Sequence, residues 1–130
     1  MYNRNNVKTA FTYVPSVASD ASVINPCFYA PAPLELTAIR FITGNATIST
    51  DWSLNVYKNV SNTDSRLSTS LAASQAAIAS LTGTSLALIT TVSLRRFATG
   101  NTIFFELIAH GGTTTNSRIE VDYVFGYTNA

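Results

Sequence analysis

The sequence predicts an all-β protein: a single antiparallel β-sandwich of about eight strands, preceded by a polar arm. Three observations lead to this prediction. Polar and apolar residues alternate along most of the chain, as they do in half-buried strands. Turn-forming residues separate these runs at the short intervals typical of sandwiches. The 130 residues suffice for one hydrophobic core, so we assign the arm to residues 1–8 and the sandwich to residues 9–130.

The arm and the composition argue against a secreted, a membrane-spanning or a nucleic-acid-binding protein. Residues 1–8 are polar and lack the apolar core of a secretory signal, which predicts synthesis in a cytoplasm. No apolar run approaches the roughly 20 residues that span a bilayer, so no membrane partner is expected. Charged residues make up 12% of the chain and the net charge is +1. Because basic residues are few and scattered, direct binding to nucleic acid is not expected either.

The first half of the sandwich contains four predicted strands. The first is Thr9–Val14. The second, Val23–Ala30, contains Pro26, which cannot donate to a ladder and therefore predicts an edge strand or a bulge. The third, Leu34–Thr43, changes the parity of its apolar residues midway, which indicates a bulge or burial on both faces. The fourth is Trp52–Tyr57, which stops at the turn-rich stretch Lys58–Asp64.

The second half begins with an ambiguous segment, residues 66–82. Spaced leucines and many alanines suit a short helix, but the recurring Ser and Thr favour a strand over Leu67–Ala73 followed by an irregular connection. Ser85–Leu94 alternates regularly and predicts a strand. Arg95-Arg96 and Gly100-Asn101 mark the turn that follows it.

The last two predicted strands are Thr102–His110 and Arg118–Tyr127, separated by a Gly-Gly-Thr-Thr-Thr-Asn stretch that indicates a hairpin. Each strand places its large apolar residues on one parity. The residues expected in the core are Ile103, Phe105, Leu107 and Ala109 on the first, and Ile119, Val121, Tyr123, Phe125 and Tyr127 on the second.

Candidate chemical groups are few. Cys27 is the single cysteine of the sequence, so neither an intramolecular disulfide nor a multi-cysteine metal site can form. The apolar residues around it in the sequence predict an inert, buried thiol. His110 is expected to be a surface residue beside a turn. Glu120 and Asp122 share the outward face of one strand. They could form a carboxylate pair, or a cation site with Glu106 across the hairpin, but surface charges neighbouring Arg118 or Arg40 are the favoured interpretation. The remaining carboxylates are Asp20, Glu35, Asp51 and Asp64.

We therefore expect no catalytic residue, no cofactor and no metal. Arg95-Arg96-Phe97 contains the closest pair of basic residues in the sequence. Two arginines are too few to form a nucleic-acid-binding groove. Contact with a protein surface is more plausible, because arginine is enriched at interfaces. The six tyrosines could include a carbohydrate-stacking platform, but their even spread favours core and interface positions.

Several runs resemble small β-sandwich proteins of tailed bacteriophages. The resemblance begins at Phe28-Tyr29-Ala30-Pro31 and covers about residues 23–127. Gly100-Asn101 stands where those proteins commonly have Gly-Asp, which is a departure from the pattern. The other runs that carry it are Leu36–Gly44, Trp52–Lys58, the Ser/Thr/Ala-rich middle and the closing strand Ile119–Tyr123.

The resemblance implies a jelly-roll capsid decoration (cement) protein. Such a protein binds the outer surface of the major capsid protein lattice, usually as a dimer or trimer, and resides on the virion after synthesis in the host cytoplasm. The polar arm could become ordered on binding. The residues we expect to contact the partner are Tyr2, Arg4, Lys8, Arg95 and Arg96.

Two other classes remain open. One is a receptor-binding or carbohydrate-binding tip of a phage tail fibre, which has a similar β-sandwich architecture. A hydrolase using Glu106, Glu120 or Asp122 as acid and base is the weakest of the three.

Overall fold

The computed structural model describes residues 6–14, 21–46, 51–59, 67, 83–110 and 114–126. Within these ranges the chain is almost entirely strand, as the sequence predicts. The elements are β1 (Lys8–Val14), β2 (Ala21–Tyr29), β3 (Leu34–Ala46), β4 (Asp51–Lys58), β5 (Gly83–Leu86), α1 (Val92–Arg95), β6 (Arg96–Phe97), β7 (Thr102–His110) and β8 (Thr114–Phe125).

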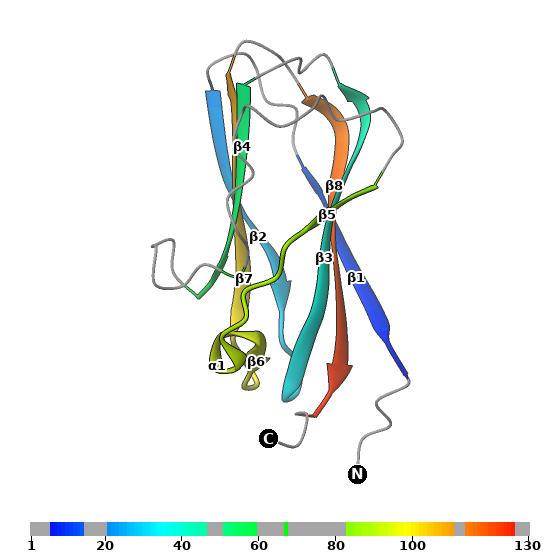
Figure 1. Ribbon diagram of the computed structural model, residues 1–130, viewed down its shortest axis with the longest axis vertical. Coiled ribbons are helices and arrows are strands. Elements are labelled where there is room, and N and C mark those ends of the chain that lie inside the picture. Colours follow the sequence, from blue (N-terminus) through cyan, green and yellow to red (C-terminus); the bar gives the residue numbers. More distant parts are fainter. Residues whose placement is uncertain are drawn as a thin grey trace.

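The strands form two antiparallel sheets that face each other (Figure 1). Sheet A has the order β1-β8-β3-β5, with β6 also pairing with β3, and sheet B has the order β2-β7-β4. The first four strands alternate between the sheets, and β8 returns to lie between β1 and β3. This strand order is that of a jelly roll. The predicted antiparallel β-sandwich is therefore confirmed.

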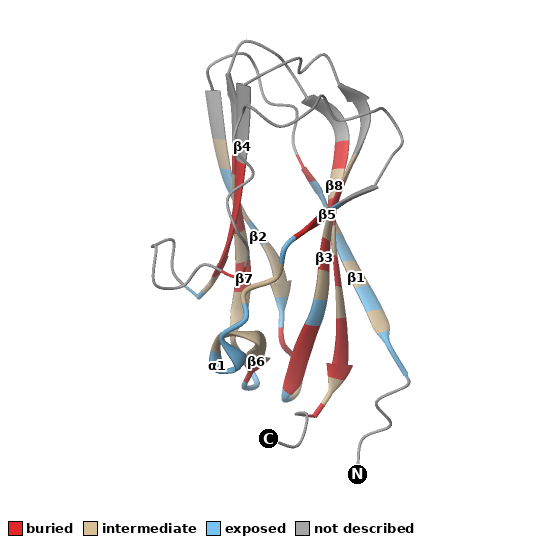
Figure 2. Cartoon of the chain, viewed as in Figure 1, coloured by how far each residue is buried: buried red, intermediate tan, exposed pale blue. Residues whose placement is uncertain are grey.

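The core lies between the sheets, where Figure 2 shows the buried stretches of β3, β4 and β8. Both sheets contribute fully buried aliphatic and aromatic side chains, because each strand directs every second residue inward. The predicted parity is confirmed for Ile103, Phe105 and Leu107 of β7 and for Ile119, Val121 and Tyr123 of β8, and Phe125 packs partly buried against the core. The side chain of Ala109 and the whole of Tyr127 lie outside the described residues. The fully buried residues include Ile39, Phe41, Ile119 and Val121 from sheet A and Leu54, Val56, Ile103, Phe105 and Leu107 from sheet B.

Both predicted irregularities are present. In β3 the register against β8 shifts between Leu36 and Ala38, and Thr37 is exposed between them. The bulge lets Leu36 and Ile39 both face the core although their parities differ. In β2 the register against β7 shifts between Pro26 and Phe28. β2 is also an edge strand of sheet B, so both explanations for Pro26 apply.

The predicted hairpin between the last two strands is wrong. β7 pairs with β2 and β4, whereas β8 pairs with β1 and β3, so the two strands belong to different sheets. The connection crosses from one sheet to the other. A hairpin within one sheet and a connection between two sheets have the same sequence pattern, an alternating strand followed by turn residues. That pattern indicates which side chains are buried, but not which strand supplies the hydrogen bonds.

The predicted strand Ser85–Leu94 is also wrong beyond Leu86. After β5 the chain leaves the sheet, forms the single turn α1 and re-enters as the two-residue strand β6, so Arg95-Arg96 spans a helix end and a strand instead of a turn. Contacts with Lys58 of β4 stabilise this departure from the sheet. The Lys58 Nζ donates to the carbonyls of Ser93 (3.2 Å) and Arg96 (2.5 Å) and lies 4.9 Å from the Phe97 ring centroid.

The turn at Gly100-Asn101 agrees with the prediction. Gly100 has a φ of +92°, a conformation that glycine adopts without strain. The amide of Asn101 donates to the carbonyl of Ala98 at 3.1 Å, and the Asn101 side chain accepts from the Ala98 amide at 2.8 Å. The amide of Gly100 donates to the carbonyl of Ala30, which ties this turn to the end of β2.

Two predictions fall largely outside the described residues. Residues 1–5 of the predicted arm are among those not described, and β1 begins at Lys8, the last residue assigned to the arm. Of residues 66–82 only Leu67 is described. It is fully buried; its amide donates to the Val56 carbonyl at 2.7 Å, and its carbonyl accepts from Ile89 at 2.8 Å.

Phe105 tests the register of the core. We expect Phe105→Ala to lower the free energy of unfolding by about 3–5 kcal/mol, because it removes a fully buried ring and leaves a cavity. Phe104→Ala is the matched control, since Phe104 is the next residue of β7 and is only partly buried. Urea denaturation would measure both. Equal losses from the two substitutions would contradict the register.

Candidate functional site

The outer face of sheet A holds the most organised polar cluster among the described residues. Residues of even number on β8 point away from the core, because Ile119 and Val121 point into it. The strand register places three rows of side chains across this face. The rows are Thr9–Asp122–Ala38, Phe11–Glu120–Arg40 and Tyr13–Arg118–Ile42 on β1, β8 and β3 respectively.

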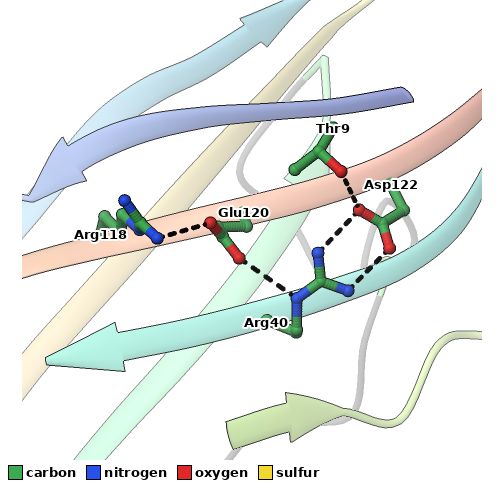
Figure 3. Close-up of polar contacts among 5 residues, drawn as sticks. All are labelled: Thr9, Arg40, Arg118, Glu120 and Asp122. Carbon is green, nitrogen blue, oxygen red and sulfur yellow. Dashed lines mark hydrogen bonds and ion pairs between the residues drawn. The ribbon is translucent and has the colours of Figure 1, made fainter. Parts of the chain in front are cut away.

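Arg40 is the centre of this cluster (Figure 3). Its two terminal nitrogens donate to the two oxygens of Asp122, each at 2.7 Å, and its Nε donates to Glu120 at 3.2 Å. Thr9 Oγ1 donates to Asp122 at 2.7 Å, and Arg118 Nη2 lies 2.9 Å from the second oxygen of Glu120. The network therefore joins three neighbouring strands through side chains.

The electrostatics of the network are those of a structural contact. The hydrogen bonds from Arg40 hold the pKa of Asp122 below its ordinary value; that from Thr9 adds to this and burial opposes it. The same Asp122 contact raises the pKa of Arg40. The carboxylate side chains are only 13% and 17% exposed. An Asp that is ionised and occupied on both oxygens is poorly suited to exchange protons near neutral pH.

The predicted outward direction of Glu120 and Asp122 and their predicted neighbours Arg118 and Arg40 are confirmed. The expectation of solvated surface charges is wrong, because the ion pairs leave both carboxylates largely shielded from solvent. The alternative cation site with Glu106 does not form, because Glu106 lies on β7 in sheet B, opposite Ile24 and Asn55. Across the described residues, no group of three or more His, Cys, Asp or Glu is placed to hold a metal ion.

An exposed aromatic pair lies beside the network. Phe11 and Tyr13 on β1 are 51% and 70% exposed, and their rings meet edge to face at 5.6 Å. The guanidinium carbon of Arg118 lies 5.3 Å from the Phe11 ring centroid. Phe11 and Tyr13 lie on the outer face of sheet A, level with Glu120 and Arg118 of β8. Large apolar side chains of an alternating strand ordinarily face the core, so the pattern of β1 alone did not predict this exposure.

The four tyrosines among the described residues divide between two environments. Tyr57 and Tyr123 are buried, in agreement with the predicted core positions. Tyr13 and Tyr29 are 70% and 62% exposed, and they lie on edge strands of different sheets. They therefore do not belong to one continuous strand pair.

The five predicted contact residues do not form one cluster in the described part of the chain. Lys8 is in β1, with Nζ 5.9 Å from the Phe125 ring centroid. Arg95 ends α1, and Arg96 in β6 places its Nε 3.9 Å from a carboxylate oxygen of Glu35. β8 and β3 lie between β1 and β6. Tyr2 and Arg4 lie outside the described residues, and a contact role for all five stays a prediction.

The other candidate groups are simple to place. Burial raises the pKa of the partly buried Cys27 thiol to about 12, so it is protonated at neutral pH, as expected of an inert cysteine. His110 ends β7 opposite Asp51, and its side chain is outside the described set. No helix among the described residues is long and apolar enough to cross a membrane.

Comparison with known proteins gives distant structural likenesses. No protein-family model matches the sequence, and no curated protein matches it significantly. One similar solved structure is the cyanophage Pam1 capsid asymmetric unit, with a TM-score of 0.45 and 10% identity over 93% of this chain and 86% of that one. Another is the infectious bursal disease virus Gx strain, with a TM-score of 0.37 and 9% identity over 91% of this chain and 32% of that one. Neither likeness is close enough to assign a function.

The ionic network predicts a pH-dependent contribution to stability. Because folding lowers the pKa of Asp122, its stabilising effect is present above the ordinary pKa of 3.8 and is lost as the pH falls through the lower folded value. We expect Asp122→Asn to cost about 1–2 kcal/mol at pH 7, with the difference from wild type closing towards pH 2.

Thermal unfolding of both proteins between pH 2 and pH 7 would measure this difference. Glu106→Gln is the control, since it removes a carboxylate from the outer face of the other sheet. A difference for Asp122→Asn that stays constant across the range would contradict the assigned role of the ionised carboxylate.

Proposed function

We propose that the protein is a non-enzymatic structural component of a virion, a capsid decoration protein that binds the outer surface of the major capsid protein lattice and stabilises the head. The observation that carries the proposal is the sequence resemblance to phage β-sandwich proteins. Of the runs that carry it, those in the described residues lie at the end of β2, in β3, β4 and β8, and in the turn before β7; the Ser/Thr/Ala-rich middle lies almost entirely outside the described residues. Jelly rolls serve in viral capsids, although they also serve in lectins.

The chemistry of the described residues supports a contact role. The carboxylates on the outer face of sheet A are engaged by Arg40, Arg118 and Thr9, and the Cys27 thiol is protonated by virtue of its burial. A net charge of +1 gives little attraction for nucleic acid. The domain is thus suited to packing against protein, with Tyr2, Arg4, Lys8, Arg95 and Arg96 as the proposed contacts.

A second candidate is the receptor-binding or carbohydrate-binding tip of a tail fibre. The observation that favours it is the exposure of Tyr13 and Tyr29, since exposed aromatic rings present an apolar face together with a polar hydroxyl. The location of the protein separates the two functions. A decoration protein lies on the shell of the head, and a fibre tip lies at the tail.

Cryo-electron microscopy of virions whose genome encodes this chain tests the proposal. We expect density for the sandwich on the outer surface of the head, at positions repeated by the capsid lattice. Density at the tail would establish the second candidate instead, and its absence from the particle would contradict both.

The arm provides a more specific prediction. Deleting residues 1–5 leaves β1 intact, since that strand begins at Lys8. We expect binding to particles lacking the protein to weaken at least about tenfold, equivalent to about 1.4 kcal/mol, because an arm that orders on the capsid contributes contacts there. Co-sedimentation would measure binding, and circular dichroism would check folding. Undiminished occupancy by the shortened, folded protein would refute the role of the arm.

A further inference from the structure

β1 is an edge strand that faces no described strand on one side. Among the described strands it pairs with β8 alone, and Figure 1 shows it at the margin of the sandwich. Amide and carbonyl groups of an antiparallel strand point alternately to its two sides. About half of the backbone groups of Lys8–Val14 therefore point away from β8. Such an edge is a template for pairing with another strand.

The edge of β1 lacks the features that usually prevent pairing. Its seven residues, Lys-Thr-Ala-Phe-Thr-Tyr-Val, include no proline or glycine and a single charge, Lys8. Its register against β8 is regular throughout. β2, an edge strand of sheet B, differs: it contains Pro26 and an adjacent register shift, both of which obstruct pairing. Of these two strands, only β1 presents an unobstructed edge.

The side chains on this edge are apolar and exposed. Phe11 and Tyr13 on the outer face are 51% and 70% exposed, and Val7, just before the strand, is 53% exposed. Figure 2 shows the alternation of exposed and intermediate residues along β1. Large apolar side chains next to open backbone groups favour an additional strand whose own side chains pack beside them.

We propose that β1 pairs antiparallel with β1 of a second copy of the chain, about a two-fold axis at Phe11, so that the two A sheets become one continuous sheet. Phe11 is the middle residue of β1, so this axis is the one that pairs the whole strand. The register it creates places Phe11 opposite the second Phe11, Thr9 opposite Tyr13, Ala10 opposite Thr12 and Lys8 opposite Val14.

This register makes the strand complementary to itself. The two Phe11 rings become direct cross-strand neighbours, with Tyr13 opposite a small Thr9 on either side, and aromatic cross-strand pairs are stabilising. The only charge, Lys8, faces Val14 and not its own symmetry mate, so no like charges oppose each other. A two-fold interface requires a surface that complements itself. β1 meets this requirement.

Identifying this dimer with the homo-oligomer expected of a decoration protein rests on the proposed function. Dimerisation through β1 concerns two copies in solution, so it can be established or overturned without a capsid. A protein that dimerises but is found at the tail would contradict the decoration role and leave the interface standing.

Cysteine cross-linking of the full chain tests the register. Phe11→Cys should give a disulfide-linked dimer under mild oxidation, since directly opposed residues fall within the Cα separation that a disulfide needs. Thr9→Cys or Tyr13→Cys alone should not, because each lies about 13 Å along the strand from its symmetry mate. A mixture of these two variants should cross-link. Wild type, which retains Cys27, is the background control.

A charge substitution tests the same interface without oxidation. Phe11→Lys places two ammonium groups across the two-fold axis while each faces Glu120 within its own chain. Ile24→Lys is the matched control: Ile24 is 53% exposed on β2 and lies opposite Glu106. By sedimentation equilibrium, we expect Phe11→Lys to raise the dimer Kd at least about tenfold and Ile24→Lys to leave it unchanged.

Three results would overturn the proposal. One is a wild-type protein that stays monomeric at about 100 µM, where a micromolar dimer would be nearly complete. Another is an oligomer whose Kd is the same with Phe11→Lys as with Ile24→Lys. The third is Thr9→Cys cross-linking to itself as fast as Phe11→Cys. Circular dichroism of each variant would establish that it is folded before its Kd is interpreted.

Discussion

The burial of one face of β8 is the constraint on which the rest of the structure depends. β8 lies between β1 and β3, and its inward residues Ile119 and Val121 are fully buried against the other sheet. Because strand side chains alternate, fixing this face also fixes the other. Glu120 and Asp122 must then point outward, where they meet Arg40 of β3 and Thr9 of β1.

Side-chain hydrogen bonds and ion pairs on the outer face of sheet A therefore link β1, β8 and β3. A bidentate contact between a guanidinium and a carboxylate fixes geometry as well as charge, and here it spans adjacent strands at 2.7 Å. The hydrogen-bonding capacity of the acidic groups is used within the protein. The same arrangement that stabilises the sheet thus makes these residues poor candidates for acid-base catalysis.

The edge strands β1 and β2, one from each sheet, differ in how open they are to pairing. β2 combines Pro26 with a register shift, whereas β1 is regular and carries exposed Phe11 and Tyr13. Of these two strands, β1 is therefore the one open to pairing with a further strand. In this arrangement the ionic network lies directly behind the open edge and holds β1 in place through Thr9.

Sequence patterns alone predicted the fold class, the inward parity of the described core residues of β7 and β8, and the irregularities near Pro26 and within β3. These features follow from local rules, since alternation and proline act through residues adjacent in the chain. The sequence also indicated Arg40 and Arg118 as neighbours of the acidic residues. Only the tertiary structure decided that β7 and β8 occupy different sheets, that the chain leaves the sheet after Leu86, and that Phe11 and Tyr13 face outward. The physical reason is that backbone hydrogen bonds are the same for every partner strand, so pairing and exposure depend on how distant segments pack together and not on the pattern within one segment.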